Sequence, residues 1–334
     1  MFRSYVLSCL DHIGVFRFLE QPRTYGEILA EFGFVDGSYT REVMETLSAD
    51  PKTLIEKKNG RYQVVKDFQV PGIDEVMRDV DPRIRPFKAL AQGMSSNILD
   101  RLREEYIDFS TALEREGNDL FHTFNQILGN KIYQSMRAGA FEFIGTRNLD
   151  QMRGKRLLDI GCGSGRESAD IWLKFDGDIK ITGVDPVPSM IAEAEKGFET
   201  YLLELSEDPP RITEANRPIF EEASATRLPY DDDSFEAVYW QFILHWTSDP
   251  RKAIAEAVRV TKPGGWIFGV QPFKPQANPY FNLVIRSNRN SHGFFWREEY
   301  RQWFRENGVD VEIATPAGMF RAQKVMRERQ SSIQ

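Results

Sequence analysis

The 334-residue sequence has few cysteines and few histidines. Two cysteines, Cys9 and Cys162, cannot build a disulfide framework or a four-cysteine zinc site, and they favour a reducing compartment. The four histidines are scattered without metal-ligand spacing, at His12, His122, His245 and His292. We therefore expect a cytoplasmic protein without a metal site.

Long apolar runs and an excess of positive charge are also missing. Asp11, His12 and Arg17 interrupt the apolar start of the chain, so it lacks the continuous core of a signal peptide. No segment approaches the roughly 20 apolar residues of a membrane span. A net charge of −7 disfavours general nucleic-acid binding. We expect no stable membrane insertion and no nucleic-acid partner.

Residues 1–70 are predicted to form a small helical domain. The first sixteen residues carry apolar side chains at steps of three and four, which predicts an amphipathic helix. A capping box that begins at Thr24 predicts a second helix, and residues 43–47 lie on a third. Residues 53–56 and 61–65, joined through Asn59-Gly60, predict a β-hairpin. Three short helices followed by a hairpin are the pattern of a winged helix.

Residues 71–148 are predicted to be a helical connector that packs onto the next domain. Its start is rich in turn residues such as Pro71-Gly72. Its apolar side chains then follow helical spacing, at Ile98, Leu102, Tyr106, Phe109, Phe121, Phe124, Ile127 and Leu128.

Residues 149–334 alternate between predicted strands and helices. The strands are predicted at 156–160, 180–184, 219–223, 235–240 and 266–270, with two closing strands at 309–313 and 319–324. The helices between them are predicted around 165–175, 187–205 and 250–260. This alternation predicts an α/β fold with a parallel, doubly wound sheet.

A glycine-rich turn ends the first of these strands, at Gly161-Cys-Gly-Ser-Gly165. In doubly wound sheets ligands bind outside the carboxyl ends of the strands, and glycine lets a nucleotide-like ligand approach the backbone closely. The G-x-G-x-G spacing differs from the dinucleotide fingerprint, whose third glycine would fall at Arg166. A tight strand-to-helix turn without a ligand is the alternative.

Asp185 ends the second strand, roughly twenty residues after this turn. An acidic side chain there can accept hydrogen bonds from both hydroxyls of a ribose. Asp185-Pro186 also fits the beginning of a helix, so a helix cap is the alternative. With the glycine turn in front of it, we favour ribose binding.

Several motifs in order resemble the Rossmann-like S-adenosylmethionine-dependent methyltransferases, in particular those of ubiquinone and menaquinone biosynthesis. The motifs are Leu157–Gly165, Gly183–Met190, Ala225–Val238, Ile243–Trp246 and Lys262–Gly265. The resemblance spans roughly residues 149–326 and implies a Rossmann-like, doubly wound, seven-stranded sheet. It implies S-adenosylmethionine as cofactor, held by Gly161, Cys162, Gly163, Asp185, Met190, Ser224, Ala225 and Gln241.

Two positions depart from the family pattern. The residue before Ala225 is usually an aspartate that accepts from the adenine amino group, and here it is Ser224. A hydroxyl can also accept that bond, so adenine recognition is weakened. After the fourth strand, His245 is a candidate general base, and a packed or capping histidine is the favoured alternative.

The N-terminal residues resemble the winged-helix dimerisation domain of small-molecule O-methyltransferases. The likeness rests on Ile13–Phe16, Thr24–Ala30 and Asn59–Tyr62. It implies a homodimer, and a helix before the cofactor domain that covers the ligand with Phe124, Tyr133 and Met136. We expect Tyr133 to contact the cofactor, and a plain core role for these three residues is equally open.

The segment from Gln271 to Trp296 is predicted to form an aromatic lid over the substrate. We expect substrate contacts from Arg286, Arg289, Phe295 and Trp296, and His292 is the second candidate base. The aromatic content suggests a ring-bearing or isoprenoid small molecule. For the two arginines a solvated helix face is the favoured alternative.

Taken together, the motifs predict an enzyme that methylates oxygen or carbon of a small metabolite. A protein or RNA methyltransferase is a second possibility, which the acidic charge disfavours for RNA. Two other classes stay open: a winged-helix regulator, and a partner subunit that binds the cofactor without catalysis.

Overall fold

The computed structural model describes residues 1–50, 52, 55–65, 69–70, 72–78, 87–103, 125–127, 129–315 and 318–325. Within these ranges the chain forms two compact units. The first unit comprises Met1–Ile127 and Ala277–Gly293, and the second comprises Leu128–Gln276 and Phe294–Gln334. The segment 277–293 therefore belongs to the N-terminal unit, although the sequence alone assigns it to the 149–334 domain.

The first unit combines helices with a small antiparallel sheet. Its elements are α1 (Phe2–His12), α2 (Val15–Phe18), β1 (Arg23–Thr24), α3 (Tyr25–Phe32), α4 (Ser38–Ala49), β2 (Ile55–Lys58), β3 (Arg61–Val64), α5 (Ile73–Arg78), α6 (Phe87–Leu102) and α14 (Pro279–Arg286). The described residues place the three strands in the order β1-β3-β2.

The predicted local signals of this unit are present. Thr24 and Glu27 form the capping box that begins α3, and Asn59 and Gly60 have φ values of 50° and 74° in the turn between β2 and β3. Of the connector residues, Ile98 and Leu102 are buried on α6 and Ile127 is buried. The predicted positions Thr53, Leu54, Tyr106, Phe109, Phe121, Phe124 and Leu128 lie outside the described residues.

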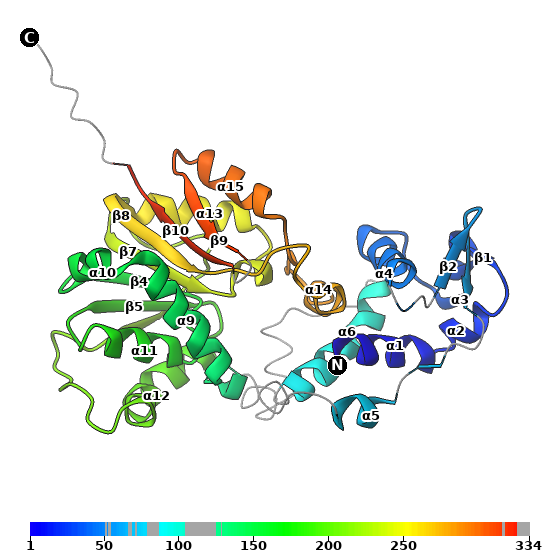
Figure 1. Ribbon diagram of the computed structural model, residues 1–334, viewed down its shortest axis with the longest axis horizontal. Helices are drawn as coiled ribbons and strands as arrows, with labels where there is room; N and C mark the ends of the chain where they lie inside the picture. The colour runs from blue at the N-terminus through cyan, green and yellow to red at the C-terminus, as the bar shows by residue number, and fades with distance from the viewer. Residues whose placement is uncertain are drawn as a thin grey trace, which may run out of the picture. The chain divides into compact units, whose positions relative to one another are not determined.

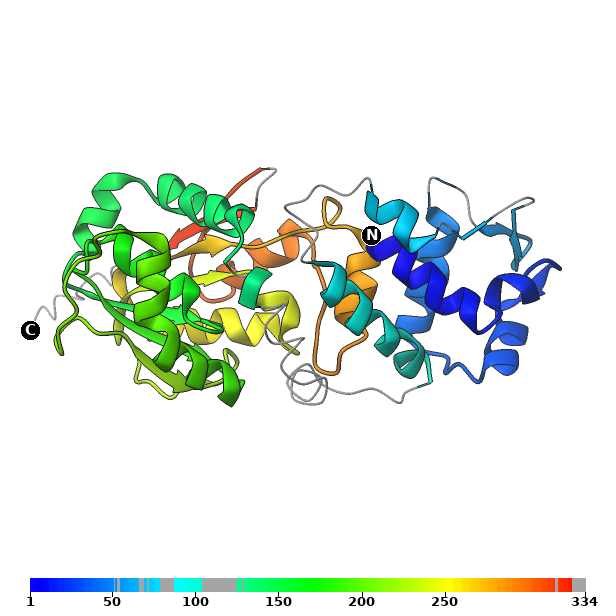
Figure 2. The same ribbon diagram turned by 90° about the horizontal axis from the view of Figure 1, so that it is seen from below.

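Helix α14 packs into the N-terminal unit although in the chain it lies between β8 and β9 of the second unit's sheet. Tyr39 on α4 donates a hydrogen bond to the carbonyl oxygen of Leu283 at 2.9 Å. The side-chain amide of Asn282 donates to Glu42 at 2.7 Å, and Tyr280 donates to Asp50. Figure 2 shows the orange α14 beside the blue and cyan helices of this unit.

The second unit is built on a seven-stranded sheet in the part of the chain that is described. The strands are β4 (Arg156–Ile160), β5 (Lys180–Asp185), β6 (Ile219–Glu222), β7 (Phe235–Gln241), β8 (Thr261–Val270), β9 (Val311–Ala314) and β10 (Met319–Gln323). Their order is β6-β5-β4-β7-β8-β10-β9, and β10 is antiparallel to both neighbours while the first five strands are parallel. This confirms the predicted fold class. Six of these seven strands begin within two residues of their predicted starts, whereas β8 begins at Thr261, five residues before the predicted start at 266.

Helices cover both faces of this sheet because the strands are apolar on both sides. The helices are α9 (Lys131–Ile144), α10 (Thr146–Met152), α11 (Arg166–Lys174), α12 (Pro188–Leu205), the 3₁₀ helix η2 (Leu244–Trp246), α13 (Pro250–Val260) and α15 (Arg297–Arg305). One core cluster joins α9, α11 and α12 to one face through residues such as Leu157 and Tyr239. The other joins α13 and α15 to the opposite face through Leu158 and Trp240. Figure 1 shows the two groups of helices.

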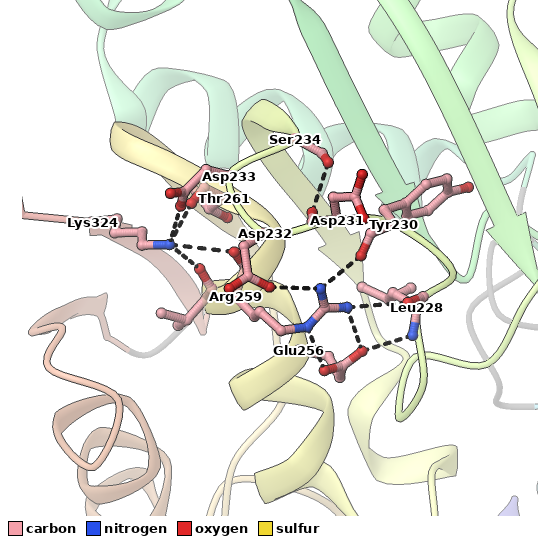
Figure 3. A network of polar contacts seen from close by, with 11 residues as sticks. Leu228, Tyr230, Asp231, Asp232, Asp233, Ser234, Glu256, Arg259, Thr261 and Lys324 are labelled. Atoms are coloured by element: carbon pink, nitrogen blue, oxygen red, sulfur yellow. Dashed lines mark hydrogen bonds and ion pairs between the residues drawn. The ribbon is translucent and has the colours of Figure 1, made fainter.

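A polar network locks the loop before β7 and the end of β10 to helix α13 (Figure 3). The Arg259 guanidinium donates to Glu256, Asp232 and the carbonyl oxygens of Leu228 and Tyr230. The ammonium of Lys324 donates to Asp233 at 2.7 Å and to the carbonyl oxygens of Val258, Arg259 and Thr261. Lys324 thus caps the carboxyl end of α13, where cations are stabilising.

Candidate functional site

The glycine turn stands at the carboxyl end of β4, where strand order reverses between β4 and β7. Gly161, Gly163 and Gly165 all have positive φ, at 72°, 52° and 81°. The amides of Gly161 and Cys162 both donate to the carbonyl oxygen of Val184, at 2.7 and 3.0 Å, which ties the turn to β5. A Cβ atom at position 161 would lie 2.4 Å from Ile243, so only glycine fits there.

Asp185 ends β5 beside this turn. Its Oδ2 accepts from the Gly163 amide at 3.1 Å, and its Oδ1 accepts from the Val187 amide at 3.0 Å. Burial raises the pKa of Asp185 to about 6, although these two amide hydrogen bonds oppose the shift. A carboxylate has roughly four acceptor positions, and hydrogen bonds from the described residues account for two of them, which is compatible with a ribose diol at the other two.

Asp159 supports the turn from within the sheet. It is fully buried on β4, and its Oδ2 accepts from the Ser168 hydroxyl at 2.6 Å on α11. Burial raises the pKa of Asp159 to about 6. Its Oδ1 has no hydrogen-bond partner within the described ranges. This residue therefore connects β4 to the helix that follows the glycine turn.

The predicted adenine-side residues follow β6 and begin α12. The Ala223 amide donates to the carbonyl oxygen of Asp185 at 3.2 Å, so the loop after β6 runs beside the ribose candidate. Ser224 is exposed, and its hydroxyl lies 2.9 Å from that of Thr226. Ala225 and Met190 are buried, with exposed fractions of 8% and 2%. The carboxyl edge of the sheet thus brings together the predicted glycine turn, Asp185 and the loop that carries Ser224.

Gln241, the last residue of β7, is held by three groups. Its Oε1 accepts from the Tyr239 hydroxyl at 2.9 Å and lies 3.4 Å from the Arg137 guanidinium. Its Nε2 donates to the carbonyl oxygen of Tyr133 on α9 at 3.1 Å. The side chain is 3% exposed. Gln241 therefore lies at the carboxyl edge of the sheet, as predicted, and its side-chain amide is hydrogen-bonded within the protein.

Arg137 is a site residue that the sequence reasoning missed. It is 1% exposed on α9, and it pairs with Glu167 at 3.0 Å and with Asp170 at 2.6 Å on α11. Burial acts to raise the pKa of Glu167, and the Arg137 guanidinium opposes this shift by stabilising the carboxylate. A helical stripe with Tyr133 and Met136 gives no local sign of a buried cation, so only the three-dimensional contacts identify it.

Phe242 follows Gln241 with a positive φ of 56°, which is uncommon for a residue with a side chain. Its ring meets that of Tyr133 edge-on, with centroids 5.1 Å apart. The sequence alone does not single out Phe242. Together the two rings bring α9 and the carboxyl end of β7 into contact.

His245 is buried in η2 and held by Gln271, which directly follows β8. Its Nδ1 lies 3.2 Å from Gln271 Nε2, which also donates to the carbonyl oxygen of Pro272. Gln271 Nε2 thus lies within hydrogen-bond distance of both the Pro272 carbonyl oxygen and Nδ1, and in this orientation of the amide Nδ1 is the acceptor. Burial lowers the pKa of His245 to about 3. The side chain is a neutral, packed histidine, and the ring of Phe294 lies 4.9 Å from it.

Three of the predicted substrate-side residues belong to the N-terminal unit, whereas the cofactor candidates belong to the second unit. Arg286 forms an ion pair with Glu42 and reaches Ser38 at 3.4 Å. Burial lowers the pKa of Arg286. Arg289 and His292 are both exposed, and Nδ1 of His292 lies 3.3 Å from the Gly293 carbonyl oxygen.

Phe295 and Trp296 lie in the second unit. Phe295 is 1% exposed and packs against Phe273, Tyr300 and Trp303, which favours a core role. Trp296 is 52% exposed beside it, and its amide donates to Glu299 at 2.6 Å at the beginning of α15.

Comparison with protein families and curated proteins adds independent evidence. Residues 158–269 match the methyltransferase domain family. The chain is 26% identical over 220 residues to 27-O-demethylrifamycin SV methyltransferase of Amycolatopsis mediterranei, covering 61% of this chain and 76% of that protein. It is 35% identical over 122 residues to demethylmenaquinone methyltransferase of Clavibacter sepedonicus, which is 36% of this chain but only 43% of that enzyme.

Solved structures share the fold along nearly the whole chain. The CurJ carbon methyltransferase has a TM-score of 0.70 at 16% identity, with 96% of this chain and 89% of that chain covered. An O-methyltransferase family protein from Burkholderia thailandensis has a TM-score of 0.57 at 17% identity, with 98% of this chain and 95% of that chain covered. The sheet order, the glycine turn and the matched residues lead to one assignment: the second unit carries a Rossmann-like, class I methyltransferase domain, of the kind that uses S-adenosylmethionine.

Proposed function

We propose that this enzyme transfers a methyl group from S-adenosylmethionine to oxygen or carbon of a small aromatic or isoprenoid metabolite. The observation that carries the proposal is the carboxyl edge of the sheet, where Asp185 keeps free acceptor positions beside a glycine turn without side-chain bulk. Relatives named for a rifamycin derivative and for demethylmenaquinone support a small ring-bearing acceptor.

The second unit supplies the residues for the cofactor. Asp185 would hold the ribose, Gly161, Cys162 and Gly163 would line the turn below it, and Ser224, Ala225 and Met190 would border the adenine. Tyr133 and Gln241 would lie toward the methionine end. When bound, the cofactor supplies an activated methyl group on a sulfonium, so the protein's main task is to hold the acceptor in line with it.

In this mechanism, positioning the acceptor contributes more than proton transfer does. Nδ1 of His245 is occupied by Gln271, and a pKa of about 3 makes the imidazole a weak base. We therefore assign His245 a packing role. An acceptor such as an electron-rich ring carbon needs little base, and for an oxygen acceptor His292 remains the candidate from the sequence.

The test is transfer of isotope-labelled methyl from S-adenosylmethionine to a panel of hydroquinones, phenols and prenylated rings. Label in an organic product with the wild type, and its loss in Asp185→Ala, would support the proposal. A wild type that binds the cofactor but labels no member of a broad panel would favour the partner-subunit alternative. Label in RNA or protein would replace the small-molecule assignment.

We further propose that the N-terminal unit is a winged-helix-type dimerisation domain and that the enzyme acts in the cytoplasm without a nucleic-acid partner. Helices α1, α3 and α4 followed by the β2–β3 hairpin support the first point. A sequence with only two cysteines, Cys9 and Cys162, fits a reducing compartment. Among the described helices, none has the length and apolarity of a membrane span. A monomeric mass in light scattering at micromolar concentration would rule out the dimer.

A further inference from the structure

Arg137 places a charged group in the interior of the second unit. Its side chain is 1% exposed, and its partners lie on different elements. Nη1 reaches Glu167 at 3.0 Å and Gln241 at 3.4 Å, and Nε reaches Asp170 at 2.6 Å. One guanidinium therefore joins α9 to α11, which follows the glycine turn, and to the end of β7.

This arrangement extends back to α9 through Gln241. The Gln241 amide donates to the carbonyl oxygen of Tyr133, one helical turn before Arg137. The Tyr133 ring then meets Phe242, whose backbone is held at positive φ directly after Gln241. Helix α9 is thus attached to the site at two successive turns, by charge at Arg137 and by its backbone at Tyr133.

Stability alone is a poor reason for this buried ion pair. Taking a guanidinium and a carboxylate out of water costs several kcal/mol per ion, and well-packed apolar residues often replace such pairs without loss of stability. Apolar residues cannot, however, reproduce the directional hydrogen bonds of the guanidinium. The planar fork of an arginine fixes the relative orientation of two carboxylates and an amide, which a lysine cannot do.

We propose that Arg137 is a positioning residue that couples helix α9 to the cofactor turn, so that α9 becomes ordered together with the bound cofactor. This inference rests on the proposed cofactor site. Arg137 acts through Glu167 and Gln241 and needs no contact with the cofactor.

The experiment compares wild type with Arg137→Met/Glu167→Gln, which removes the cation together with its fully buried carboxylate partner. The other partner, Asp170, keeps its charge, and its side chain is 31% exposed to solvent. S-adenosylhomocysteine is titrated by calorimetry, and hydrogen exchange is followed with and without it. The matched control is Arg153→Met/Asp176→Asn. Arg153 pairs with Asp176 at 3.0 Å and donates to the Phe175 carbonyl oxygen, at the opposite, amino-terminal edge of the sheet.

In the wild type and the control, S-adenosylhomocysteine should slow exchange in both α9 and α11. In the double variant we expect about tenfold weaker binding, within the usual range of coupling between sites, with protection retained in α11 and lost in α9. If the double variant does not fold, Arg137→Lys is measured in the same way and should show the same loss in α9.

Unchanged affinity together with unchanged protection of α9 would overturn the inference and leave Arg137 a structural residue. A folded wild type that does not bind S-adenosylhomocysteine would instead overturn the proposed function, and the inference with it. The two failures are therefore distinguishable in the same data.

Discussion

At the scale of single residues, burial shifts acids and bases in opposite directions at this site. Asp159 and Asp185 have raised pKa values because burial disfavours the carboxylate, whereas His245 has a lowered pKa because burial disfavours the imidazolium. The sequence makes His245 a candidate base and favours a packed or capping histidine, but its local spacing does not reveal that Gln271 and Phe294 contact it. Burial and tautomer depend on contacts between distant segments.

The buried His245 makes stability depend on pH. Below about pH 6.5 the imidazole is protonated in the unfolded chain, whereas in the native protein, with a pKa of about 3, it stays neutral. The free energy of unfolding therefore decreases as the pH falls. In His245→Asn this contribution to the pH dependence is absent, because asparagine does not titrate. The stability advantage of the wild type over the variant should therefore shrink by about 2 kcal/mol between pH 7 and pH 5. Urea unfolding of both proteins at the two pH values measures it, and an unchanged difference would show a solvated histidine.

At the scale of elements, the glycine turn depends on the absence of one methyl group. Gly161→Ala should lower the free energy of unfolding by about 1–3 kcal/mol and weaken cofactor binding, because the new Cβ meets both positive φ and Ile243. Gly308→Ala is the matched control, since Gly308 has a φ of 73° with nothing within 4 Å of its Cβ position. Denaturant unfolding and calorimetry compare them. Equal effects of the two substitutions would mean that the contact with Ile243 is unimportant.

The carboxyl end of helix α13 is capped by Lys324, which directly follows β10. Lys324→Met removes a cation that donates to Asp233 and to carbonyl oxygens at the end of α13, while its side chain is only 16% exposed. We expect a loss of about 1–3 kcal/mol in the free energy of unfolding. Lys58→Met, at a side chain that is 79% exposed, should change it by less than about 0.5 kcal/mol. Similar losses in both variants would contradict the capping role.

The elements of the sheet could be predicted well because their signals are local. Alternating strands and helices, the capping box at Thr24 and the glycine turn each depend on neighbouring residues. The role of Arg137 and the placement of α14 could not be predicted from the sequence, because both depend on partners far away in sequence. For Arg286 the sequence favours a solvated helix face over a substrate contact, and neither interpretation includes the ion pair with Glu42 that the structure shows.

At the scale of the whole molecule, the N-terminal unit includes segment 277–293, which the chain supplies between β8 and β9 of the other unit. Glu42 on α4 pairs with Arg286 and accepts from Asn282, both in segment 277–293. Glu42→Gln should accelerate hydrogen exchange in α4 and α14 by about tenfold or more, and leave strands β4 to β8 unchanged, because local opening follows local contacts. Glu298→Gln on α15 is a surface control of the same kind. Equal acceleration in the sheet would mean that the two units unfold as one.

The most direct test of the account is calorimetric titration of the wild type and Asp185→Ala with S-adenosylmethionine and S-adenosylhomocysteine between pH 5 and pH 8. We expect micromolar binding by the wild type, of the order usual for cofactors and substrates. Affinity should rise as the pH passes about 6, where Asp185 loses its proton, and then level off. Asp185→Ala should bind at least about tenfold more weakly. A folded wild type that binds neither ligand, or an alanine variant that binds both as tightly, would contradict the cofactor site described here.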